Sequence, residues 1–347
     1  PMMGLDALRA RIRDGRAARQ RRAALKRHGL AVLPLRRDMP EAEDGLAALD
    51  RLWQAGELDR FDALYAAAEA RDLMMGNALK LHVVLWTELL ARAEGAGDGP
   101  ALDRLCEPFA RWWERSGTPM AGAAYASALL SAAFAHRGGG YVDTVSEAQW
   151  AAFNARIETG RGVLDACAAS GAGSLPWAWT HYDYGLHGND GFEDFQGRFM
   201  RAWSLDTANW QICVAHGVRL LPRWFGDGMG DLDGFARHAA SVGQDRFGAG
   251  LYALIYGRGY AIGNHDVRDT LCDVDLLMRG YEDLAARYPC QSIYNRWAAG
   301  LYFARRYGAC AEVFRTRITA IVPEIWLGDR EEEQVDDALD TIRAVGD

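Results

Sequence analysis

The densest group of side chains that could do chemistry lies in the segment Trp177–Asp190, which reads WAWTHYDYGLHGND. If this segment is helical, Asp183 and His187 lie four positions apart on one face, a spacing that suits metal ligands or a base with its orienting carboxylate. His181 lies six positions before His187, about a third of a turn away around the helix. Metal ligation would need partners from elsewhere in the chain, so we expect no metal and no cofactor. An ion pair or a helix cap is the simpler role for Asp183 and His187.

Four large aromatic residues fall within eight positions of the same segment, namely Trp177, Trp179, Tyr182 and Tyr184. Core packing is the usual role of such residues, but four of them so close together cannot all point into one core. Exposed aromatic side chains commonly anchor peptides or partner proteins. We therefore predict that these four residues, with His181, line a binding groove.

The carboxylates of this region support an enzymatic alternative. Glycosidases need two carboxylates across a pocket, one as an acid and one as a base or nucleophile. Asp183, Asp190, Glu193 and Asp194 could supply them, and Asp183, His187 and Glu193 are the candidate catalytic residues. The corresponding fold is an α/α-barrel in which an aromatic-lined mouth works on a carbohydrate.

Sequence signatures of common enzymes are absent from the chain. No GxSxG, HExxH, kinase signature or strand-associated GxGxxG occurs, and the run Gly226–Asp231 lacks the Lys-Ser/Thr of a phosphate loop. This absence favours a binding or scaffold role over catalysis.

Charge is distributed unevenly along the chain. Residues 1–37 contain eleven Lys or Arg against Asp6 and Asp14, a balance of +9, and the formal total of −8 therefore leaves −17 for residues 38–347. An acidic body repels phosphate backbones and suits basic peptides or basic proteins. We expect no nucleic acid on the body, and the N-terminal residues form a basic helix or arm that is either solvated or docked on the body.

Six cysteines are scattered without a CxxC motif, so neither a disulfide framework nor a zinc site is expected. No apolar region follows the charged N-terminal residues, and no apolar run approaches the roughly 18 residues that span a membrane. These features predict a cytoplasmic protein without a membrane span.

Apolar residues recur at spacings of three and four along nearly the whole chain, and Leu30–Leu35 is the main candidate for extended structure. Glycine and proline breakers recur mostly at intervals of about 12 to 20 residues, which is typical of stacked helical hairpins. Thr118 before Pro119 predicts one helix start, and a capping box at Thr144–Glu147 predicts another. We predict an all-α array of antiparallel helical hairpins, a tetratricopeptide-like α-solenoid, straight or curled, with little or no sheet.

Three stretches carry a likeness to a known family: His136–Trp150, Leu220–Trp224, and Asn295–Ala298 together with Ile325–Trp326. Over roughly residues 120–328 the chain resembles the uncharacterised bacterial tetratricopeptide-like family catalogued as domain of unknown function number 4034. One departure is Phe225, where the family usually has Gly directly after the Trp, so Gly226 is expected in the left-handed conformation. The resemblance implies a helical-repeat fold and no particular reaction.

These patterns divide the chain into a basic helix or arm (1–37), N-terminal hairpins (38–119) and a tetratricopeptide-like region (120–347), the last two packed as one body. The leading functional interpretation is a helical-repeat protein that binds a protein or peptide, with a basic partner favoured by the acidic body. An immunity-type or assembly-factor role also fits that charge. The carbohydrate-active α/α-barrel remains the alternative.

Overall fold

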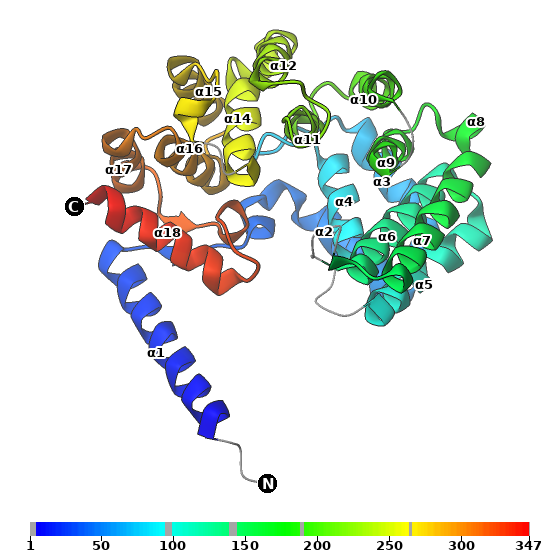
Figure 1. The fold of residues 1–347 in the computed structure, drawn as a ribbon, viewed down its shortest axis with the longest axis horizontal. Helices are drawn as coiled ribbons and strands as arrows, with labels where there is room; N and C mark the ends of the chain where they lie inside the picture. The colour runs from blue at the N-terminus through cyan, green and yellow to red at the C-terminus, as the bar shows by residue number, and fades with distance from the viewer. Residues whose placement is uncertain (1–4, 94–98, 139–143, 188–190, 264–265, 347) are drawn as a thin grey trace. The chain divides into compact units, whose positions relative to one another are not determined.

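The computed structural model describes residues 5–93, 99–138, 144–187, 191–263 and 266–346 of an almost entirely helical chain (Figure 1). Within these ranges there are eighteen α-helices, several short 3₁₀ helices and one pair of two-residue strands. The predicted all-α helical array is therefore confirmed.

The chain separates into two compact units by its internal contacts. Unit 1 contains Pro1–Pro40, Gly76–Ala78 and Gly217–Asp347, and unit 2 contains Glu41–Met75 and Leu79–His216. These units cut across the ranges expected from the sequence, because the N-terminal 40 residues belong with the C-terminal part of the chain.

Unit 2 is a series of helices in which neighbours along the chain pack on one another. Its α-helices are α2 (Glu43–Ala55), α3 (Phe61–Ala70), α4 (Leu81–Leu90), α5 (Gly99–Ser116), α6 (Pro119–Arg137), α7 (Glu147–Ala166), α8 (Ala168–Gly171), α9 (Leu175–Tyr184) and α10 (Phe192–Leu205). Its 3₁₀ helices are η3 (Leu58–Arg60), η4 (Ala91–Ala93) and η6 (Gly185–His187). Helix α11 (Trp210–Arg219) crosses the division between the units.

Unit 1 combines the first helix of the chain with the C-terminal helices. Its α-helices are α1 (Leu5–His28), α12 (Met229–Val242), α13 (Gln244–Phe247), α14 (Gly250–Gly263), α15 (Val274–Arg287), α16 (Gln291–Phe303), α17 (Tyr307–Thr316) and α18 (Glu331–Gly346). It also contains β1 (Ala31–Val32), β2 (Ala320–Ile321), η1 (Leu35–Asp38), η7 (Val267–Asp269) and η8 (Pro323–Ile325), while η2 (Pro40–Ala42) lies at the division.

Two helix starts were predicted from capping residues, and one is confirmed as predicted. Helix α6 begins at Pro119, and the side chain of Thr118 accepts a hydrogen bond from the N–H of Ala121 at 3.3 Å. Helix α7 is capped two residues later than predicted, by a reciprocal capping box between Ser146 and Gln149. Thr144 with Glu147 and Ser146 with Gln149 both have the capping-box spacing, so the sequence pattern alone does not choose between them.

Gly226 does not adopt the left-handed conformation expected of it, since its φ is not positive. A glycine is needed there for a different reason. A Cβ atom at this position would overlap the carbonyl oxygen of Leu220, so the backbone can approach that carbonyl only without a side chain.

The predicted extended segment after the basic helix forms β1, which pairs in parallel with β2. The residues that follow it are fixed to helix α16, because the buried carboxylate of Asp38 accepts the N–H groups of Gln291 at 3.1 Å and Ser292 at 2.5 Å. These two N–H groups have no partner inside their own helix, so a carboxylate from a distant part of the sequence caps them.

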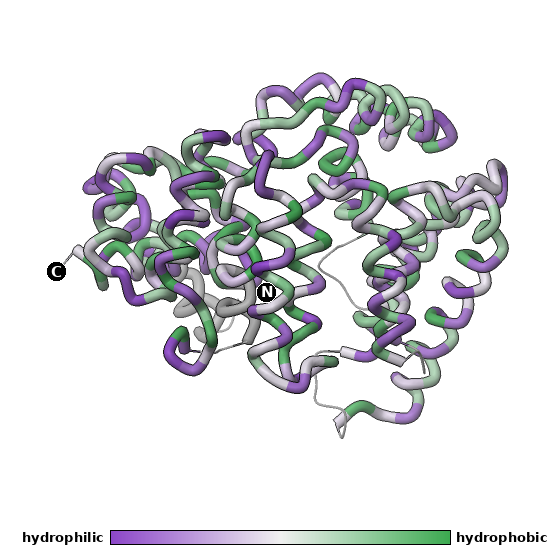
Figure 2. The backbone as a smooth tube through the Cα atoms, turned by 90° about the horizontal axis from the view of Figure 1, so that it is seen from above, coloured by the Kyte–Doolittle hydropathy of each residue, from purple (hydrophilic) through white to green (hydrophobic). Residues whose placement is uncertain are grey.

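Apolar and polar residues are interleaved along the helices, and long uniform apolar stretches do not occur in the part of the chain that is drawn in colour (Figure 2). Among the described residues no helix is both long and apolar enough to cross a membrane.

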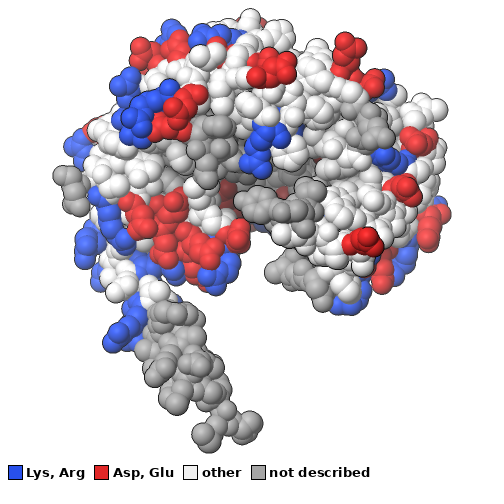
Figure 3. Space-filling view, viewed as in Figure 1, with Lys and Arg blue, Asp and Glu red and all other residues white. Residues whose placement is uncertain are grey.

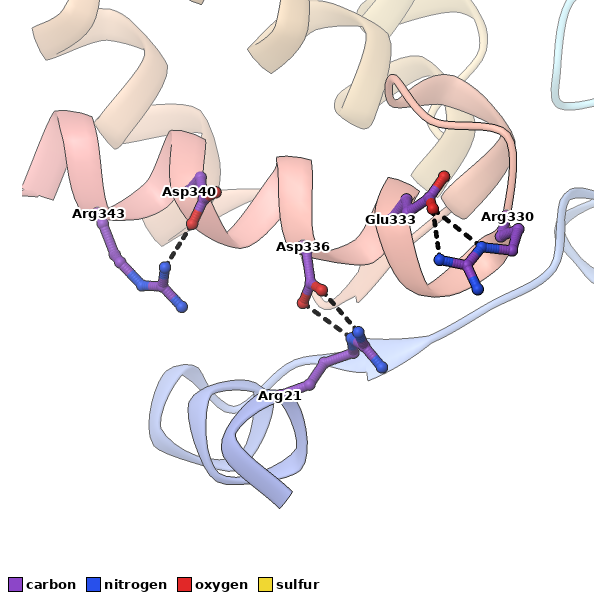
Figure 4. A network of polar contacts seen from close by, with 6 residues as sticks. All are labelled: Arg21, Arg330, Glu333, Asp336, Asp340 and Arg343. Carbon is purple, nitrogen blue, oxygen red and sulfur yellow. Dashed lines mark hydrogen bonds and ion pairs between the residues drawn. The ribbon is translucent and has the colours of Figure 1, made fainter. Parts of the chain in front are cut away.

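The described side chains of α1 show how the basic helix is held within unit 1. Ala24 and Leu25 pack against the hydrophobic core built around α16, α17 and α18. On the same side, the guanidinium of Arg21 forms two hydrogen bonds with the carboxylate of Asp336, at 2.8 and 2.6 Å (Figure 4). Carboxylates gather over α18 beside the basic helix (Figure 3). The described half of α1 is thus docked through its less polar face and one ion pair.

Candidate functional site

A pocket in unit 1 lined by several aromatic side chains, hereafter the α16–α18 pocket, is the candidate site. It has a volume of about 160 Å³. Its walls come from α14, α15, α16, the segment from η8 to Leu327, and α18. Helix α14 packs on α15 and α16, while α16, the segment around η8 and α18 share one hydrophobic core.

The floor of the pocket is the side chain of Tyr281 on α15, which is only 2% exposed. Two glycines, Gly257 on α14 and Gly300 on α16, make room for it, since a Cβ atom at either position would overlap the tyrosine side chain. The hydroxyl group has no hydrogen-bond partner among the described residues. A hydroxyl that lines a cavity can donate to a carbonyl or another acceptor that enters it, a contact that contributes about 0.5 to 1.5 kcal/mol.

Aromatic side chains form the walls. Tyr302 and Phe303 at the end of α16 are half-buried and lie edge to face with ring centroids 6.2 Å apart. Trp326 is buried and held in place, because its indole N–H donates to Oδ1 of Asn295 at 2.8 Å. The Asn295 amide group in turn donates to the carbonyl of Ala320. Hydrogen bonds thus hold the Trp326 side of the pocket in place, whereas the side formed by Tyr302 and Phe303 is partly exposed to solvent.

The mouth of the pocket lies between Leu327, which is 44% exposed, and Asp337 on α18. Oδ2 of Asp337 accepts the N–H of Leu327 at 3.0 Å, which fixes the loop after η8 to the helix. Burial raises the pKa of Asp337, and the nearby charge of Asp340 raises it further. Arg296 lines the same pocket, and its charge acts on Tyr281.

The size of the pocket limits what it can hold. Pockets for cofactors and drug-sized ligands occupy roughly 300 to 1,000 Å³, whereas an apolar cavity of about 150 Å³ holds a benzene ring. The α16–α18 pocket therefore fits one large side chain, with an acceptor and a cation at its edges.

The predicted aromatic lining is mostly inside unit 2. Trp177, Tyr182 and Tyr184 are at most 2% exposed. Each polar tip is also bonded: the Trp177 indole donates to the carbonyl of Leu164, and Tyr184 donates to that of Ala126. These three residues pack in the core, so any surface role of the segment falls to its half-buried members.

Trp179 and His181 are those half-buried members. The His181 ring stacks on the buried Trp177 ring, with centroids 4.6 Å apart and planes at 12°. This stacking explains the position of the histidine by packing alone.

The candidate catalytic residues do not share one helical face. Helix α9 ends at Tyr184, so His187 lies in the 3₁₀ helix η6 and its helical register with Asp183 is lost. The His187 ring packs edge-on against Phe134, with centroids 5.1 Å apart. Glu193 is exposed in the first turn of α10, where a negative charge stabilises the helix N-terminus.

Two further carboxylates belonged to the enzymatic alternative. Asp194 is exposed beside Glu193 in the same helical turn, and Asp190 lies outside the described residues. In the described structure both Glu193 and Asp194 lie at the N-terminus of α10, where negative charge complements the helix dipole.

His216 is the buried polar centre of this part of unit 2. Its Nδ1 is 3.2 Å from the Tyr182 hydroxyl and its Nε2 is 3.0 Å from Oε1 of Gln196, while Phe199 stacks on the ring at 3.8 Å. Burial lowers the pKa of His216 to about 3. The neutral, fully packed imidazole is a structural group.

The described residues form neither a metal site nor a reactive thiol. Among them no group of three or more His, Cys, Asp or Glu side chains is arranged to hold a metal ion. All six cysteines are free, and burial raises the pKa of Cys106 to about 11 and that of Cys310 to about 12. Thiols with such pKa values stay protonated at neutral pH and are poor nucleophiles.

Of the residues that line the pocket, sequence reasoning named Arg296, Ile325 and Trp326 only through the family likeness at Asn295–Ala298 and Ile325–Trp326. It missed Tyr281 and Asp337 entirely. The signal available in the sequence was the pair of glycines inside apolar helices, Gly257 and Gly300, since an isolated helical glycine often marks a close approach.

Comparison with protein-family models, with curated proteins and with solved structures finds no match for this chain. Its function is therefore inferred from geometry alone.

Proposed function

We propose that this chain is a helical-repeat protein that binds a protein or peptide partner and acts as an adaptor or scaffold. The observation that supports this most directly is the α16–α18 pocket, which has aromatic walls, an unpaired hydroxyl on its floor and the volume of one side chain. A pocket of this size suits the anchor residue of a partner, because binding energy at protein interfaces concentrates in a few large side chains inserted into such pockets.

Two further proposals accompany this function. Residues 120–328 are assigned to the tetratricopeptide-like family on the three sequence stretches named above, and the packing of consecutive helices agrees with that assignment. A cytoplasmic location is proposed because all six cysteines are free, as is usual in a reducing compartment.

The proposal is tested by selecting a random dodecapeptide library displayed on phage against the immobilised full chain. Two variants change the pocket: Ala299→Leu fills it from the wall, and Leu327→Ala shortens one side of its mouth. Ala311→Leu makes the same change as the first variant at a half-buried position of α17 that does not line the pocket.

Peptides selected on the unmodified chain are expected to lose at least about tenfold in affinity for Ala299→Leu, which corresponds to about 1.4 kcal/mol. They should bind Ala311→Leu within about twofold, and Leu327→Ala should weaken them to an intermediate degree. Circular dichroism checks that each variant is folded. If no peptide is enriched, or if the enriched peptides bind Ala299→Leu unchanged, the pocket is not a peptide site and the proposal fails.

A further inference from the structure

We propose that the partner of the α16–α18 pocket is a basic segment: a large apolar anchor enters the pocket, and an adjacent Lys or Arg pairs with Asp337 at its mouth. This inference rests on the proposed function and names the chemistry of the partner.

Asp337 is the residue that selects charge at the mouth. Its carboxylate is half-buried, and its hydrogen bond to the N–H of Leu327 uses only Oδ2. Among the described residues it has no cationic partner. A partly desolvated carboxylate with a free oxygen gains more from an incoming cation than a fully solvated one does. The same burial raises the pKa of the Asp337 carboxyl group.

The other carboxylates of α18 have partners or a local explanation, which singles out Asp337. Arg21 pairs with Asp336, Arg330 with Glu333 and Arg343 with Asp340 (Figure 4). The first turn of α18 begins with Glu331 and Glu332, where negative charge stabilises the helix N-terminus. Together these residues still make the surface around the mouth acidic (Figure 3), which favours approach of a basic segment.

The Tyr281 side chain at the floor of the pocket is a second feature that suits a partner, and it does not depend on charge. Tyr281 is 2% exposed, and its hydroxyl lines the pocket without a partner among the described residues. Arg296 lines the same pocket, and its charge acts on Tyr281. The inner part of the pocket therefore offers a hydrogen-bond donor, the Tyr281 hydroxyl, whereas the mouth offers an acceptor. The aromatic walls match the apolar part of a large anchor, and the carboxylate at the mouth matches an adjacent cation.

The experiment analyses the peptides selected on the unmodified full chain. The most strongly enriched sequence is synthesised with its ends blocked, in three forms: as selected, with each Lys or Arg replaced by Gln, and with its largest apolar residue replaced by Ser. Affinities are measured for the unmodified chain and for Asp337→Asn. Asp340→Asn is the matched control, because this carboxylate lies on the same helix but does not line the pocket.

We expect the enriched sequences to place Lys or Arg within two positions of a large apolar residue. Asp337→Asn should weaken the selected peptide about five- to tenfold, as is typical of a partly desolvated charge pair, and should leave the Gln form unchanged. Asp340→Asn should change either affinity by less than about twofold.

Three outcomes would overturn the inference, and they are distinguishable. Enriched peptides that depend on Ala299 but are neutral or acidic would leave the peptide site standing and remove the basic partner. The same holds for basic peptides that bind Asp337→Asn as tightly as the unmodified chain. Failure to enrich any pocket-dependent peptide would remove the proposed function and this inference with it.

Discussion

The floor of the α16–α18 pocket makes a quantitative prediction for Gly257, which lies inside helix α14. Replacing a glycine in a helix interior by alanine normally stabilises a protein by about 1 kcal/mol, because the backbone loses less entropy on folding. Here the new Cβ atom would overlap the hydroxyl oxygen of Tyr281, while the next atom of that side chain, Cζ, would be 3.5 Å away, an ordinary contact. The conflict thus involves a single oxygen atom.

Overpacking of a core side chain is unfavourable by about 1 to 3 kcal/mol. Gly257→Ala is therefore expected to lower the free energy of unfolding by up to about 2 kcal/mol, the difference between this penalty and the helix gain. In a Tyr281→Phe background the oxygen is gone, and the same substitution should stabilise by about 0.5 to 1 kcal/mol. The coupling between the two positions is then about 1 to 3 kcal/mol.

Tyr281→Phe alone should change stability by less than about 1 kcal/mol, because the hydroxyl has no partner to lose among the described residues. Gly234→Ala on α12 is the matched control, since a Cβ atom there meets nothing within 4 Å and should stabilise in both backgrounds. Urea unfolding followed by circular dichroism gives the stabilities. Hydrogen exchange of α14 to α16 shows whether the effect lies in unit 1. If Gly257→Ala stabilises the unmodified chain as much as the control does, the tyrosine hydroxyl does not lie against Gly257 and the floor is wrongly described.

Three other perturbations give expected outcomes. Asp38→Ala leaves two N–H groups of α16 without their acceptor and should destabilise unit 1 by about 2 kcal/mol or more, measured by hydrogen exchange of that helix. His216 has a pKa of about 3 when folded, below its unfolded value, so the unfolded chain binds the proton first. The stability provided by the neutral buried imidazole is complete above about pH 6.5 and is lost as the pH falls toward 3. Over this range the free energy of unfolding should fall by up to about 1.4 kcal/mol per pH unit, and this slope should be absent in His216→Phe. Arg21→Ala should reduce protection of the docked half of α1 by only about 0.5 to 1 kcal/mol, because Asp336 is 46% exposed.

The helical character of the chain could be predicted because the relevant information is local. Breakers, caps and the spacing of apolar residues act within a few positions, and Thr118 shows that a cap followed by proline fixes a helix start. Turns were less predictable. The chain turns after α16 at Arg305, which has a φ of 59°, although a glycine, Gly308, follows three positions later and lies inside α17. The neighbouring packing, which the sequence does not display, selects the residue that adopts the strained conformation.

The pocket could not be predicted because its walls come from residues as far apart as Leu254 and Thr341. The N-terminal residues present the same difficulty. Asp38 caps a helix more than 250 positions later in the chain, and charge patterning indicated only that the preceding helix is basic. Contacts at such separations depend on the fold as a whole.

The aromatic residues of units 1 and 2 show what distinguishes a binding residue from a packing residue. Gly171 makes room for the ring of Trp177, just as Gly257 makes room for Tyr281, so neither size nor burial separates the two cases. Buried polar tips without a partner also occur in the core, at Tyr65 and Trp112, so the difference lies in whether the tip lines a cavity. The indole of Trp177 donates to a backbone carbonyl, whereas the hydroxyl of Tyr281 lines a cavity and has no partner among the described residues. A hydroxyl that lines a cavity can bond to a ligand that enters it, whereas the fully bonded indole of Trp177 cannot. Counting large aromatics in the sequence pointed to residues 177–184, but the unsatisfied hydroxyl points to α15.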